Sequence, residues 1–160
     1  MKKLICALLA VMMLLSLTAC GGGTTKTEEK NVPAPDMEAV FASMHAQLPS
    51  DAVAFSSEYV FDAYGVKAED CKQQVVLSYY DGTVTAEIWM IEAVNKTALK
   101  EIKKLADARL ESMQDQFQSY DQNAYALTKK AKLFTEGDCL VFFVSENVDQ
   151  LMEIYNSAER

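Results

Sequence analysis

The chain has 160 residues with 15 basic and 23 acidic side chains, which gives a formal net charge of −8 at pH 7. This length suits one domain. An acidic surface disfavours nucleic acid and anionic lipid head groups as partners, so we expect no nucleic-acid partner.

The N-terminus has the pattern of a secretory leader. Lys2 and Lys3 precede a nearly unbroken apolar run from Leu4 to Leu15. A membrane-spanning helix needs about 20 apolar residues, so this run is too short to span a bilayer. It fits the apolar region of a signal peptide, and residues 1–19 are therefore predicted to be one. The alternatives are a buried helix or a short membrane anchor.

The leader ends in Leu17-Thr18-Ala19-Cys20. This stretch resembles the bacterial lipobox, in which Leu, a small or polar residue, and Ala or Gly precede Cys. The resemblance implies cleavage before Cys20 and attachment of diacylglycerol to its sulfur. The protein is then expected on the extracytoplasmic face of the cell membrane, with the membrane as its partner through Cys20. Without residues 1–19, which include Lys2 and Lys3 and no acid, the formal charge becomes −10.

Residues 20–35 are predicted to be a flexible linker, because they are rich in Gly, Thr, Lys, Glu and Pro. A single globular domain is expected over residues 36–160. Its periodicity predicts helices and strands in the order α-α-β-β-α-β-β-α. The expected elements are a helix from the N-cap Asp36 to Leu48, a helix over 57–65, a hairpin over 73–93, a long amphipathic helix over 95–120, a hairpin over 125–146 and a last helix opened by a capping box of Asn147 and Gln150.

Tight turns between neighbouring strands favour an antiparallel sheet. The fold class is therefore predicted as α+β, with a four-stranded, mainly antiparallel sheet from two hairpins. One long helix lies between the hairpins, helices lie at both ends of the domain, and the helices are expected on one face of the sheet.

Catalytic and metal-binding patterns are weak in this sequence. His45 is the only histidine and is expected on a helix surface. Glu69, Asp70 and Glu87 are the carboxylates that a hydrolase would use. Two cysteines and one histidine do not make a zinc site, and the stretch from Asp121 lacks the glycine and glutamate of a calcium loop. No cofactor and no metal are expected.

Cys71 and Cys139 are the cysteines of the expected domain. Outside the cytoplasm they could form a disulfide, which would stabilise the domain by about 4 kcal/mol on the chain-entropy model. The alternative is two semi-buried thiols that never meet, because spacing alone does not determine their distance.

Adjacent aromatic residues occur on the predicted strands, and strand neighbours point to opposite faces. One of each pair must therefore leave the helix-covered face. This predicts a binding surface of Tyr79, Trp89 and Phe142 on an open sheet face. The alternatives are a partly solvated sheet and coverage by the N-terminal helices.

Several of these segments resemble a family of bacterial lipoproteins known as domain of unknown function four-three-five-eight. The resembling residues are Tyr64-Gly65-Val66 with Glu69-Asp70, the long helix from Asn95, and "EGDCLVFFVSENVDQLMEI". The similarity covers about residues 36–155 together with the lipobox. It implies a location and a fold, and it carries over no active site.

Taken together, the sequence favours a membrane-anchored extracytoplasmic lipoprotein that acts as a binding or accessory module of the cell envelope. Its partner would be an envelope protein or a small ligand. The alternatives are an envelope hydrolase that uses carboxylates and a structural component of the envelope.

Overall fold

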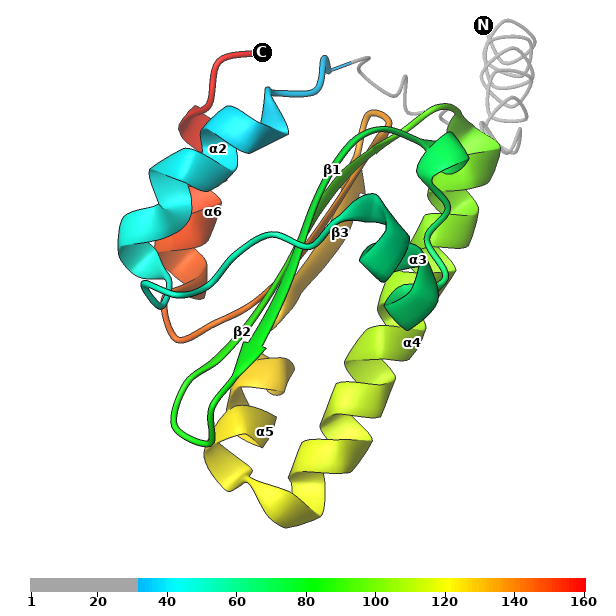
Figure 1. The fold of residues 1–160 in the computed structure, drawn as a ribbon. Helices are drawn as coiled ribbons and strands as arrows, with labels where there is room; N and C mark the ends of the chain where they lie inside the picture. Colours follow the sequence, from blue (N-terminus) through cyan, green and yellow to red (C-terminus); the bar gives the residue numbers. More distant parts are fainter. Residues whose placement is uncertain (1–31) are drawn as a thin grey trace, which may run out of the picture.

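The computed structural model describes residues 32–160, which form one four-stranded sheet with helices on both faces (Figure 1). The signal peptide, Cys20 and most of the predicted linker lie outside the described residues. The elements are α2 (Met37–Met44), η1 (His45–Gln47), α3 (Ser57–Tyr64), η2 (Ala68–Asp70), β1 (Cys71–Tyr80), β2 (Thr85–Ala93), α4 (Lys96–Tyr120), α5 (Gln122–Lys129), β3 (Lys132–Glu136), β4 (Cys139–Val144) and α6 (Val148–Ser157).

The sheet is antiparallel throughout, with the strand order β1-β2-β4-β3. Two hairpins, β1–β2 and β3–β4, join through the β2–β4 pair, in which Trp89 lies opposite Phe142. The long helix α4 connects the hairpins. The predicted α+β class and the two-hairpin sheet are confirmed.

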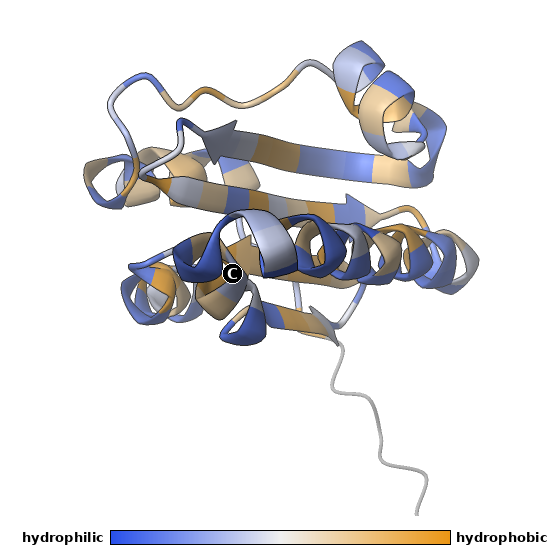
Figure 2. Cartoon of the chain, turned by 90° about the horizontal axis from the view of Figure 1, so that it is seen from below, coloured by the Kyte–Doolittle hydropathy of each residue, from blue (hydrophilic) through white to orange (hydrophobic). Residues whose placement is uncertain are grey.

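Each face of the sheet carries its own hydrophobic core. On β2, Ala86, Ile88 and Met90 point toward α2 and α6, whereas Trp89 and Ile91 point toward α3, α4 and α5. Hydrophobic and hydrophilic residues are mixed along each helix in Figure 2, as expected for helices with one face on the sheet and one on solvent. The expectation of helices on one face is wrong, because the second face of β2 is apolar enough to need its own cover.

Three helix ends agree with the sequence prediction. The Asp36 carboxylate accepts hydrogen bonds from the amides of Glu38 and Ala39, and Asn95 caps α4 in the same way. Gly65 ends α3 with a φ of 78°, in the left-handed region that favours glycine. These caps satisfy backbone groups that the helix itself leaves unpaired.

Two other expectations are corrected. The stretch expected as a strand from residue 125 begins as helix α5, and β3 starts only at Lys132. Asp121 starts this helix, since its side chain accepts hydrogen bonds from the amides of Asn123 and Ala124. The capping box at α6 does not form, because the Asn147 side chain instead donates to the carbonyl of Gln47.

The described chain enters the domain along one end of the sheet. A Cβ placed on Gly137, in the β3–β4 turn, would lie 2.6 Å from the carbonyl oxygen of Val32. The Gln73 side chain then donates to the Pro35 carbonyl and accepts from the Met37 amide. We call this the N-terminal end of the sheet. Between residues 32 and 160, no helix has the length and apolarity needed to cross a membrane.

Candidate functional site

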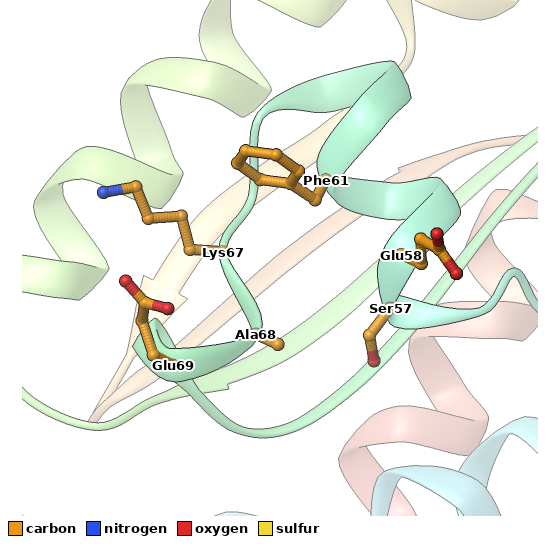
Figure 3. A pocket seen from close by; sticks show the side chains of 6 residues that line it. All are labelled: Ser57, Glu58, Phe61, Lys67, Ala68 and Glu69. Atoms are coloured by element: carbon orange, nitrogen blue, oxygen red, sulfur yellow. The ribbon is translucent and has the colours of Figure 1, made fainter.

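A shallow pocket lies between α3 and η2, with a volume of about 430 Å³. Figure 3 shows the Phe61 ring projecting from α3 toward the segment that carries Lys67. The pocket is lined by Ser57, Glu58, Phe61, Lys67, Ala68 and Glu69. Phe61 is 50% exposed, so the pocket offers an apolar surface with charged side chains at its rim. Such a surface suits contact with an apolar group. Of the three predicted carboxylates, Glu69 lines this pocket.

The most organised polar cluster is buried between α4 and the sheet. The carboxylate of Glu87 on β2 is fully buried and accepts hydrogen bonds from Arg109 Nε and Nη2, both at 3.0 Å. The indole N–H of Trp89 donates to the same carboxylate at 2.8 Å. Burial works to lower the pKa of Arg109, but its hydrogen bonds to Glu87 and the charge of Glu87 raise that pKa on balance. Arg109 therefore keeps its charge next to the buried carboxylate, whose oxygens are all occupied by donors of the cluster.

Two further side chains complete this cluster. Arg109 Nη2 reaches the Ser78 hydroxyl on β1 at 3.3 Å, and its guanidinium carbon lies 5.4 Å from the centre of the Tyr64 ring on α3. Burial and then the charge of Glu87 raise the pKa of Tyr64, so its hydroxyl stays neutral. The cluster thus joins α3, α4 and two strands. A carboxylate held in this way is a structural anchor and is not available as a base.

Glu87 does not meet the other two predicted carboxylates, Glu69 and Asp70. Asp70 precedes β1, whereas Glu87 lies opposite Ser78 near the other end of that strand. Eight residues of extended chain separate the two positions by roughly 25 Å. His45 is exposed and follows α2, on the other face of the sheet from Glu87. Among residues 32–160, no three His, Cys, Asp or Glu side chains gather in a way that could hold a metal ion.

Cys71 and Cys139 are free thiols in the structure. They lie on β1 and β4, which are separated by β2. Their side chains also belong to opposite cores, since Cys139 packs toward α2 and α6 and Cys71 packs on the α4 side. The arrangement is that of two separate thiols and not of the disulfide alternative.

The predicted aromatic surface is not an open face. Trp89 and Phe142 are fully buried, because α3 and α4 cover the face on which they lie. Tyr79 points to the other face and is half-buried, and its hydroxyl lies 3.3 Å from Asp81 and 3.5 Å from Asp51. The interpretation of Trp89 and Phe142 as a binding surface is therefore corrected: they are core residues.

Four aromatic side chains within residues 32–160 are exposed, namely Tyr59 and Phe61 on α3 together with Tyr80 and Tyr120. The last two fall in the predicted hairpin over 73–93 and at the end of the predicted helix over 95–120. Tyr120 is 71% exposed and Tyr80 is 38% exposed, and their ring centres lie 6.5 Å apart. They lie at the end of the sheet opposite Gly137, where the β1–β2 turn meets the α4–α5 junction (Figure 1). We call this the far end.

A comparison with known protein families identifies the family of this chain. Residues 46–145 match the family model described as Domain of unknown function (DUF4358). The chain belongs to this family. The matched DUF4358 region spans both hairpins and α3–α5, and it contains Glu87 and Arg109. No match was found among curated proteins or among solved structures.

Proposed function

We propose that this DUF4358 protein is a lipid-anchored binding module on the extracytoplasmic face of a bacterial membrane. In this proposal, Cys20 carries the diacylglycerol anchor, and the domain presents a surface to a partner in the cell envelope. The proposal joins the lipobox pattern at 17–20 with the position at which the chain enters the folded domain.

The proposal depends on the positions of the tether and of two exposed tyrosines, which lie at opposite ends of the sheet. Val32 lies against Gly137 at the N-terminal end of the sheet, so a tether through Cys20 would join the domain at that end. The exposed rings of Tyr80 and Tyr120 lie at the far end. A tethered module would therefore present Tyr80 and Tyr120 at the end away from the tether, whereas Phe61 lies on α3 beside η2.

The polar groups of the domain support binding better than catalysis. Glu87 is buried with its carboxylate bound by Arg109 and Trp89, and Glu69 and Asp70 lie at the opposite end of β1. General acid–base catalysis needs its groups within hydrogen-bond reach of one substrate atom. The pocket beside Phe61, by contrast, is mainly a contact surface.

The anchor is tested by Cys20→Ser, with Cys6→Ser as the matched control in the same leader. Fractionation of cells is expected to show wild-type and Cys6→Ser protein in the membrane fraction. Cys20→Ser protein is expected to be released or to accumulate as uncleaved precursor. Normal processing and unchanged membrane retention of Cys20→Ser would contradict the proposal.

A further inference from the structure

We propose that the far end of the sheet is a docking surface for a basic segment of a partner protein, in which Lys or Arg side chains contact Tyr80 and Tyr120. The direction in which this surface faces rests on the proposed function. The binding itself is a property of the folded domain and is tested separately below.

The two tyrosines form an aromatic platform, in which Tyr80 is the ring held by its neighbours. Tyr80 packs on the buried ring of Phe117, with ring centres 5.2 Å apart, and its hydroxyl donates to Asp121 Oδ2 at 3.0 Å. The other oxygen of Asp121 caps α5. Tyr80 is therefore held by its neighbours, and Tyr120 lies beside it with most of its surface exposed. A ring that is already ordered loses little side-chain entropy when a partner binds.

A second feature lies on the other side of the β1–β2 hairpin. A pocket of about 290 Å³ is lined by Tyr79, Asp81 and Glu146, together with residues 46–49 and others of the far end. Asp81 is held there by hydrogen bonds from Thr83 and Val84, and those bonds lower its pKa to about 2. The pocket thus offers a carboxylate that stays ionised at neutral pH, on the face of the hairpin opposite the aromatic platform.

The charges at the two ends of the sheet differ. The part of the far end around the β1–β2 turn consists of residues 46–53, 78–86, 117–125 and 145–147, which contain four acidic residues and no Lys or Arg. The lysines at this end lie toward β3, where Lys132 pairs with Asp149 and Lys129 lies over the Tyr125 ring. The four acidic residues are Asp51, Asp81, Asp121 and Glu146. Within residues 32–160, none of the four forms a salt bridge, whereas at the N-terminal end Lys72 and Lys96 pair with Glu92 and Asp138.

The exposed tyrosine rings and the carboxylates together indicate which kind of partner would bind the far end. The face of a tyrosine ring attracts a Lys or Arg cation, and uncompensated carboxylates add a complementary field. Anionic lipid and nucleic acid would be repelled. A second copy that docked by the same face would bring like charges together, because a two-fold interface pairs a surface with itself. A basic protein segment satisfies both the aromatic and the acidic groups.

The test uses the full-length chain in neutral detergent and a labelled 12-residue peptide of sequence (Lys-Ala-Arg-Ala)₃, with (Glu-Ala-Gln-Ala)₃ as the acidic comparison. Fluorescence anisotropy at constant salt gives each dissociation constant. We expect binding of the basic peptide alone. Tyr120→Ala should weaken it about fivefold and Asp121→Asn about threefold, where Asn keeps an oxygen for the α5 cap.

Two matched controls separate the surface from general charge and exposure. Tyr59→Ala removes another exposed tyrosine, 52% exposed on α3, and Asp107→Asn removes an exposed acid on α4. Both should leave the dissociation constant within about twofold of the wild-type value, and circular dichroism verifies that each variant is folded.

Three results would overturn this inference. They are no binding of the basic peptide, equal weakening by Asp107→Asn and Asp121→Asn, and a dimer that Tyr120→Ala dissociates in sedimentation. None of them bears on the lipid at Cys20, so failure of the docking surface is distinguishable from failure of the anchor.

Discussion

Arg109 and Glu87 form a side-on ion pair in which two nitrogens of the guanidinium contact the two oxygens of a fully buried carboxylate. The pair connects the middle of α4 to β2 and lies within the core that also contains Trp89 and Phe142. Its members are 22 residues apart in the chain, so it forms only when the helix is docked on the sheet.

Arg109→Met is expected to lower the free energy of unfolding by about 3–5 kcal/mol, because it leaves the Glu87 carboxylate buried without its counter-charge. Adding Glu87→Gln should recover at least half of this loss, since Gln keeps an acceptor for Trp89. Urea unfolding measures both. Lys103→Met, which breaks an exposed pair with Asp107, is the control and should cost less than about 1 kcal/mol. Equal effects of Arg109→Met and Lys103→Met would show that the buried pair is not an anchor.

The contact between Gly137 and Val32 gives a second prediction. Gly137 and Gly82 both have positive φ, at 57° and 89°, but a Cβ at Gly82 would meet nothing within 4 Å. Alanine at either position pays the left-handed backbone cost of about 1 kcal/mol. Gly137→Ala should therefore lower the unfolding free energy further than Gly82→Ala, and deletion of residues 1–33 should remove the difference. If the two alanine variants were equally stable, Val32 would not lie against the turn.

The thiols of Cys71 and Cys139 are expected to make the folded domain less stable at alkaline pH. Burial, with smaller contributions from Asp70 and Glu92, raises the pKa of Cys71 and of Cys139 to about 11 each. Unfolded cysteine ionises near pH 8.5, so both states bind the proton below that pH and stability is unaffected. Between about pH 8.5 and 11 only the unfolded thiols lose protons, and the unfolding free energy should fall by up to about 1.4 kcal/mol per pH unit for each thiol.

This dependence is measured by urea unfolding under reducing conditions from pH 8 to 10.5. The control is the Cys71→Ala/Cys139→Ala double variant, which retains the tyrosines that also titrate in this range. The double variant should show a shallower decline than the wild type. Parallel curves for the two proteins would mean that the thiols are not shielded from water in the folded state.

Most of the fold follows from local patterns in the sequence. The alternation on β2 places Ile88 and Met90 on one face and Trp89 and Ile91 on the other, and Asp36 and Asn95 stand at helix starts. Helix α5 was missed because its residues include β-type side chains next to a true strand. The signal for this helix is Asp121, which stands in the incomplete calcium-loop pattern and caps the helix in the structure.

The site residues depend on contacts between distant segments, which local patterns do not contain. Arg109 lies three residues after Ala106 and four before Met113, both buried, so it falls on the inward stripe of α4. Glu87 interrupts the apolar face that carries Trp89. A charged residue on the inward stripe of α4 and an acidic residue on the apolar face of β2 together predict a buried ion pair, provided that the helix packs on that face of the sheet. The sequence does not predict the exposure of Tyr120. The apolar stripe of α4 includes this residue, but the end of the helix extends past the end of the sheet (Figure 1).

The central claim, an acidic module anchored by lipid on one sulfur, is tested most directly by intact-mass spectrometry of the protein isolated from its native membranes. We predict a chain that begins at Cys20 and carries a diacylglycerol on that residue. A chain that still contains residues 1–19, or one that begins at Cys20 with a free thiol, would contradict the account.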